Sequence, residues 1–167
     1  VAPRRRLLDE FGTPAAALAA GPRAWRETGL DETQTIALGQ CANEALVTAR
    51  AWLAQPGHHL LGWHDPAYPP QLRRLSSPPL ALFVDGDPAL LWHPSVAIVG
   101  SRAPSPGGRD NARRFARDLA EAGFCVVSGL AAGIDTAAHE GALAAPSGLT
   151  VAVLGTGPDL AYPRENA

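Results

Sequence analysis

The spacing of apolar residues separates a helical first third of the chain from an α/β second half. Between residues 96 and 154, three short continuous apolar runs alternate with two stretches in which apolar residues recur at helical spacing. Continuous runs of this length are typical of parallel strands that are buried on both faces. The pattern predicts strands at 96–99, 124–127 and 150–154 in an α/β, doubly wound, mostly parallel sheet.

The two helices between these strands have recognisable ends and faces. Gly123 suits the left-handed position that ends the first helix, and Asp135 is predicted to cap the second, which continues to about Ala145 before Pro146. The first helix is expected to start late, after Pro104 to Gly108. Its predicted core face consists of four residues at helical spacing: Ala112, Phe115, Ala116 and Leu119.

Residues 4–54 read as short helices that are separated by Gly turns. Thr13 before Pro14 is a typical helix start, and Asp31 is predicted to cap a longer helix that runs to about Leu53. Prolines exclude long helices from 55–79, and strands at 58–62 and 80–84 are predicted to extend the sheet on one edge. We therefore expect a helical module at 1–56 and an α/β domain at 57–167.

The charge pattern adds one local feature to a nearly neutral chain of 167 residues with net charge −2. All 14 basic residues are arginine, which suits phosphate contacts and stacking on bases, although a GC-rich genome explains the same usage. Five lie beside the first Gly-rich turn: Arg102, Arg109, Arg113, Arg114 and Arg117. Short apolar runs and two isolated cysteines predict no membrane segment, disulfide framework or metal site, and a cytoplasmic protein.

Three Gly-rich turns follow the three predicted strands, at 100–102, 128–135 and 155–157. Sheets of this type bind ligands at the carboxyl ends of their strands, and the start of a following helix attracts anions. Glycine also allows close approach to the backbone, and the Arg102 guanidinium can grip a phosphate. We predict a phosphate site here; the alternative is a set of tight turns in which Arg102 is merely exposed and Asp135 is merely a cap.

Other residues allow two interpretations each. The segment from Gly155 begins like a dinucleotide-binding fingerprint, but Leu160 replaces its third glycine, so a nicotinamide cofactor is disfavoured. Tyr162 fits base stacking or core packing, and Arg164 fits phosphate contact or a solvated charge. His139 fits structural hydrogen bonding better than catalysis. No nucleophile elbow, zinc-protease motif or Walker lysine is found, and no catalytic residue, cofactor or metal is predicted.

Four segments in fixed order now carry a family resemblance: YPPQLRRLSSPPLALFVDGD, IVGSR, SGLAAGIDTAAHEGAL and TVAVLGTGPDLAYPREN. Over about residues 60–167 they resemble the DNA-processing protein A family, also called Smf or DprA. The helical first part resembles that family's sterile-alpha-motif-like domain by general pattern. The resemblance implies a Rossmann-like fold that binds single-stranded DNA, protects incoming DNA in natural transformation and loads the RecA recombinase, without catalysis.

By motif position, the resemblance assigns DNA- and phosphate-binding roles to seven residues: Gly100, Ser101, Arg102, Ser128, Gly129, Gly133 and Asp135. Arg164 joins them as a candidate phosphate contact. Family members continue past the last motif with further DNA and dimer contacts. We therefore expect an N-terminal fragment of a protein that is a homodimer at full length.

Two other functions remain open from the sequence. An enzyme that binds nucleotides or phosphoribosyl groups on a related fold is one, although the PGGxGTxxE stretch of such enzymes is missing. A partner-binding scaffold, with the helical module as its working surface, is the other.

Overall fold

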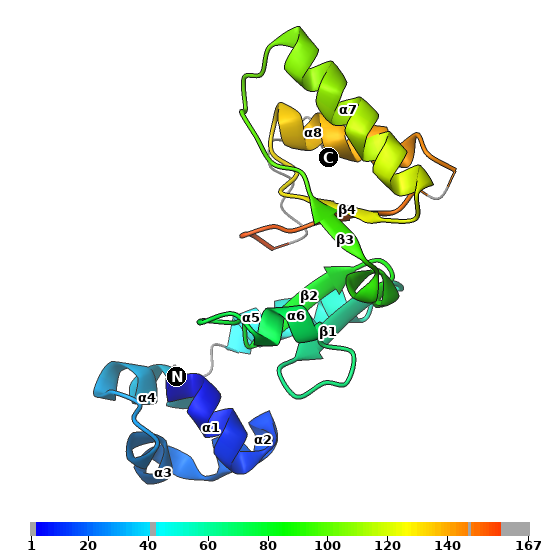
Figure 1. Cartoon of the computed structure of the whole chain (residues 1–167). Helices are drawn as coiled ribbons and strands as arrows, with labels where there is room; N and C mark the ends of the chain where they lie inside the picture. The colour runs from blue at the N-terminus through cyan, green and yellow to red at the C-terminus, as the bar shows by residue number, and fades with distance from the viewer. Residues whose placement is uncertain (1–2, 41–42, 147, 158–167) are drawn as a thin grey trace. The chain divides into compact units, whose positions relative to one another are not determined.

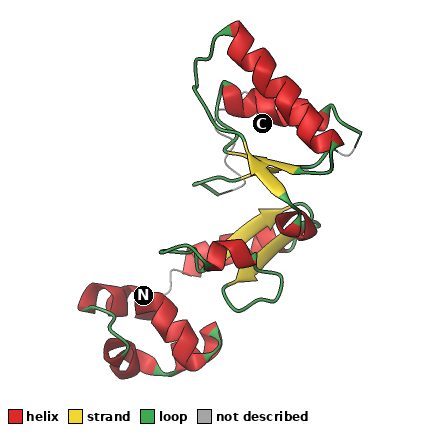
Figure 2. Ribbon diagram, viewed as in Figure 1, coloured by secondary structure: helices red, strands yellow, loops and turns green. Residues whose placement is uncertain are grey.

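The computed structural model describes residues 3–40, 43–146 and 148–157 and divides the chain into two compact units, 1–86 and 87–167 (Figure 1). The first unit combines helices with a two-stranded sheet, and the second is a three-stranded sheet with the helices α7 (Pro106–Glu121) and α8 (Ile134–Leu143) (Figure 2). No helix among the described residues is long and apolar enough to cross a membrane.

Four short helices open the first unit: α1 (Pro3–Phe11), α2 (Pro14–Ala19), α3 (Gly21–Glu27) and α4 (Glu32–Gly39). Thr13 caps α2, and Asp31 forms a capping box with Gln34 at the start of α4, so both predicted helix starts are confirmed. The small core of these helices gathers around Trp25, whose indole N–H donates to the Ala17 carbonyl at 2.6 Å.

The predicted long helix from Asp31 to Leu53 is wrong. Helix α4 ends at Gly39, the residue type with the lowest helix propensity after proline, and α5 (Asn43–Leu53) is a separate helix. Several apolar residues of this stretch are open to solvent, with Ile36 51% exposed.

Strands β1 (His58–Gly62) and β2 (Ala81–Asp85) pair antiparallel, and the short helix α6 (Pro70–Arg73) lies in the connection between them. Both predicted strands are present, but they form a two-stranded sheet of their own rather than an edge of the parallel sheet. Each strand bonds the other along one edge, in a ladder that pairs Leu60 with Phe83.

In the second unit, a 3₁₀ helix, η1 (Pro88–Trp92), precedes the three-stranded parallel sheet of β3 (Ser95–Ala97), β4 (Cys125–Ser128) and β5 (Thr150–Ala152). The strand order β3-β4-β5 confirms the predicted parallel neighbours. Helices α7 (Pro106–Glu121) and α8 (Ile134–Leu143) connect the strands and lie on the same side of the sheet (Figures 1 and 2). Successive right-handed crossovers in one direction produce this placement.

Small side chains make the contact between α7 and α8 close. Ala116 and Ala120 of α7 pack with Ala138 and Ala142 of α8 over Val126, and all five are fully buried. The predicted core position of Phe115 is wrong, because its side chain is 64% exposed. Neighbouring residues on a helix point about 100° apart, so a stripe centred on Ala116 turns Phe115 toward the flank.

Candidate phosphate-binding site

Two of the Gly-rich turns touch each other at the carboxyl ends of β3 and β4. The Ile134 N–H, at the start of α8, donates to the Ser101 carbonyl at 3.1 Å. Gly133 has φ of +92° and lies so close to the first turn that a Cβ there would be 2.8 Å from the Arg102 carbonyl carbon. The sequence placed these turns at one edge of the sheet, and the structure brings them into direct backbone contact.

Backbone N–H groups remain available in both turns. In the part of the chain that the structure describes, the N–H groups of Ser101 and Arg102 donate no hydrogen bond, and neither do those of Ala131, Ala132 and Gly133. Successive free N–H groups in a turn create a concave, positively polarised surface that suits an anion. The sequence did not single out Ala131 and Ala132, because alanine side chains carry no chemical signal and only the backbone contributes here.

The second turn contains a strained residue. Leu130 has φ of +57°, the left-handed region that a non-glycine residue seldom occupies. Such a conformation costs of order 1–3 kcal/mol and persists only where the surrounding structure imposes it. Here the Thr136 N–H and hydroxyl both donate to the Ala131 carbonyl, at 3.1 and 2.8 Å, and hold the turn against α8.

Three predicted site residues support the turns through hydrogen bonds. The Asp135 carboxylate, 7% exposed, accepts the Gly129 N–H at 3.1 Å, and a Cβ at Gly129 would lie 2.9 Å from the same oxygen. Asp135 lies in the first turn of α8, whose N-cap is Gly133, so the predicted capping role of Asp135 is wrong. The Ser128 hydroxyl donates to the Ile98 carbonyl at 2.6 Å and links the two strands.

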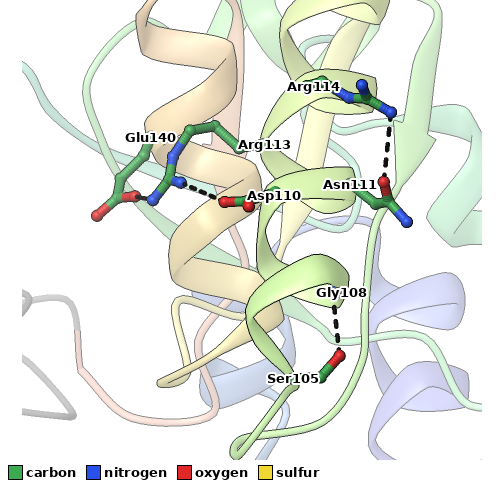
Figure 3. A network of polar contacts seen from close by, with 7 residues as sticks. All are labelled: Ser105, Gly108, Asp110, Asn111, Arg113, Arg114 and Glu140. Atoms are coloured by element: carbon green, nitrogen blue, oxygen red, sulfur yellow. Dashed lines mark hydrogen bonds and ion pairs between the residues drawn. The ribbon is translucent and has the colours of Figure 1, made fainter.

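Arg102 differs from most of the arginines that follow it. It is exposed and has no ion pair or hydrogen bond among the described residues. On α7, by contrast, Arg113 binds Glu140 of α8 at 2.5 Å and Asp110 at 3.5 Å, which raises its pKa, mainly through the hydrogen bond to Glu140 (Figure 3).

The remaining α7 arginines divide in the same way. Arg114 donates to the Asn111 side chain at 3.3 Å (Figure 3), and Arg117 pairs with Asp118 and Glu121 at 3.8 and 3.7 Å. Arg109 has no such partner among the described residues. The Arg102 turn therefore offers a guanidinium without a competing carboxylate, whereas most of the α7 face is already paired.

His139 is buried behind the site, 6% exposed, on the sheet side of α8. The Thr150 hydroxyl donates to the Val126 carbonyl at 2.8 Å, so its single proton is used and the His139 Nδ1–H must donate to it, also at 2.8 Å. Nε2 is therefore the unprotonated nitrogen, and it is buried without a partner among the described residues. Burial lowers the pKa of His139, although the Asp135 carboxylate opposes the shift. The structural interpretation of His139 fits this geometry.

The other predicted positions divide by location. Gly155, Thr156 and Gly157 follow β5 at the same edge of the sheet and are exposed. Arg164, and with it Tyr162, lies outside the described residues. The described part of the candidate site thus consists of backbone donors at 101–102 and 131–133, one free guanidinium, and the supporting side chains of Ser128 and Asp135.

Comparison with known proteins decides the family. The family model described as DNA recombination-mediator protein A matches residues 59–167, well over half of the chain. The chain belongs to this family. The resemblance to the DprA and Smf proteins is thereby confirmed.

Individual members of the recombination-mediator family show how much of a relative this chain represents. It is 39% identical to protein Smf of Escherichia coli over 142 residues, covering 85% of this chain and 38% of that protein. It is 46% identical to the DNA processing protein DprA of Streptococcus pneumoniae over 102 residues, covering 61% of this chain and 36% of that protein. The chain thus spans well under half the length of these relatives.

Solved structures agree with the fold. The X-ray structure of DprA from Streptococcus pneumoniae matches with a TM-score of 0.60 at 32% identity, covering 89% of this chain and 56% of that one. A structure of DNA processing protein A from Helicobacter pylori, described for its single-stranded DNA binding mode, matches with a TM-score of 0.57 at 34% identity. That match covers 65% of this chain and 47% of the other. These neighbours confirm the Rossmann-like class of the α/β unit.

Proposed function

We propose that the second unit binds the phosphate backbone of single-stranded DNA at the 100–102 and 129–134 turns, as part of a recombination mediator. The observation that supports this most is the contact between the two turns, which combines free backbone N–H groups with the unpaired Arg102 guanidinium. Contacts to phosphate fix a strand in place without reading its sequence. Binding is therefore expected to be insensitive to base sequence and strongly dependent on salt.

The proposal is for binding rather than catalysis. Two side chains at this edge that could act in catalysis are engaged within the protein: the Ser128 hydroxyl donates to the Ile98 carbonyl, and the Asp135 carboxylate accepts the Gly129 N–H. The rival function, hydrolysis of a nucleotide or phosphoribosyl substrate, would need one of these groups to be free. Release of the base from a nucleoside monophosphate by the purified chain would favour that rival.

The finer parts of the proposal concern the longer proteins of this family. We propose that such a protein, as a homodimer, loads the RecA recombinase onto the bound strand during natural transformation. The support is the family membership and the names of the DprA relatives. An isolated 167-residue chain presents one such site, and a dimer presents two. The isolated chain is therefore expected to bind DNA more weakly than the dimer.

The test is a salt titration of oligo-dT binding by fluorescence anisotropy, with wild type, Arg102→Ala and Arg117→Ala. Arg117→Ala is the matched control, since this arginine is paired on α7. Losing one phosphate contact should weaken binding and lower the log–log salt slope by roughly 0.7 in Arg102→Ala only. Equal affinities and slopes for wild type and Arg102→Ala would contradict the proposal.

A further inference from the structure

Position 100 requires a glycine because of a neighbouring side chain and not because of its own backbone conformation. Its φ is not in the positive range, so a left-handed backbone is not what requires a glycine here. A Cβ at this position, however, would lie 2.7 Å from Cγ1, 2.9 Å from Cβ and 3.0 Å from Cγ2 of Ile134. The glycine is therefore required by the Ile134 side chain, which lies against the Gly100 backbone.

Ile134 contacts the same turn a second time through its main chain. Its N–H donates to the Ser101 carbonyl, while its side chain packs on Gly100, one residue earlier. Ile134 is the first residue of α8, so the helix fixes its backbone, and β-branching restricts its side chain to few rotamers. The segment just before Arg102 is thus held at two adjacent points by one rigid residue.

The same hydrogen bond has a consequence for the α8 terminus. The first N–H of the helix is directed to a protein carbonyl and is not available to a ligand. The contribution of α8 at this edge is to hold the 100–102 turn in place. The N–H groups that a phosphate could bind belong to the two turns and not to the helix.

We propose that Ile134 is a positioning residue for DNA binding: it sets where the Ser101 and Arg102 donors meet a phosphate, without touching the DNA. The proposal rests on the proposed function of this edge. Its atomic basis is the contact of the branched Cβ, with Cγ1 and Cγ2, against Gly100. Valine retains all three of these atoms, whereas alanine keeps only Cβ, and this difference makes the proposal testable.

The experiment measures oligo-dT affinity by anisotropy and stability by urea unfolding for Ile134→Val and Ile134→Ala in the 167-residue chain. Ile134→Val should bind within about twofold of wild type, and Ile134→Ala should bind roughly tenfold more weakly with a lower salt slope. A purely structural role would lower stability in Ile134→Ala and leave the affinity of the folded protein unchanged. That outcome, or equal affinities of the two variants, would overturn the proposal.

A second pair of variants tests the same contact from the other side. Gly100→Ala should weaken binding, and adding Ile134→Gly to it should recover part of the affinity, because glycine at 134 removes all three atoms that the new methyl would meet. Gly107→Ala is the control for adding a methyl, since nothing lies within 4 Å of a Cβ there. A double variant that binds no better than Gly100→Ala would contradict the proposal.

DNA binding at this edge and the positioning role of Ile134 can be disproved separately. If wild type and Arg102→Ala bind oligo-dT equally, the proposed function fails and the Ile134 variants are expected to bind like wild type. If Arg102→Ala loses affinity while both Ile134 variants bind like wild type, the DNA site stands and Ile134 does not position it.

Discussion

Replacing Gly133 with alanine should damage the protein in two separable ways. The first is conformational: φ is +92°, and strained conformations of this kind cost of order 1–3 kcal/mol in a residue with a Cβ. The second is steric, because the new methyl would meet the Ser101 carbonyl oxygen and lie 2.8 Å from the Arg102 carbonyl carbon. Overpacking against backbone costs roughly 1–3 kcal/mol more. We expect Gly133→Ala to lower the free energy of unfolding by about 2–6 kcal/mol in total.

Gly123→Ala isolates the first effect. Gly123 also has a positive φ, +87°, but nothing lies within 4 Å of a Cβ there, so only the conformational cost applies. Urea unfolding of wild type and both variants, followed by circular dichroism, gives the difference between them. The steric term also predicts that the folded fraction of Gly133→Ala binds oligo-dT less tightly, whereas Gly123→Ala does not. Equal destabilisation of the two variants would refute the proposed contact between the turns.

Two further predictions concern residues that support the site, and a third concerns the small helical core around Trp25. His139 has a folded pKa below its unfolded value of about 6.5, so its contribution is fully present above that pH and is lost as pH falls below it. Urea midpoints from pH 7.5 to 5 should therefore fall less in His139→Gln than in wild type. Asp135→Ala leaves the Gly129 N–H without its acceptor and should cost roughly 1–3 kcal/mol of stability, whereas Asp135→Asn keeps an acceptor and should cost less. Trp25→Phe loses the bond to the Ala17 carbonyl and should lower the free energy of unfolding by about 0.5–1.5 kcal/mol for that bond plus a packing term, which a lower thermal midpoint would report.

The sequence predicted the features of this fold that depend on local pattern. The three parallel strands follow from apolar runs, and the starts of α2 and α4 follow from Thr13 and Asp31, whose side chains act within three residues. Gly123 was assigned to a left-handed helix end for the same local reason, and its φ confirms this.

Features that depend on distant neighbours could not be predicted in the same way. Phe115 and Ala116 are both apolar at helical spacing, and only the close packing of α7 on α8 selects the alanine. An aspartate at a helix start suits a cap equally well as a contact to an earlier turn, and the position of Gly129 decides between them. The sequence did not single out Ile134, because its contact with Gly100 spans more than thirty positions along the chain.

The central claim is that the two joined turns hold the phosphates of single-stranded DNA through their backbone. The most direct measurement is a titration of the ¹⁵N-labelled chain with oligo-dT, followed by amide chemical shifts. We predict the largest shifts at the N–H groups of Ser101, Arg102 and residues 131–133, which donate no hydrogen bond among the described residues. Shifts that leave these amides unchanged and concentrate on the α7 arginines or in the first unit would contradict the claim.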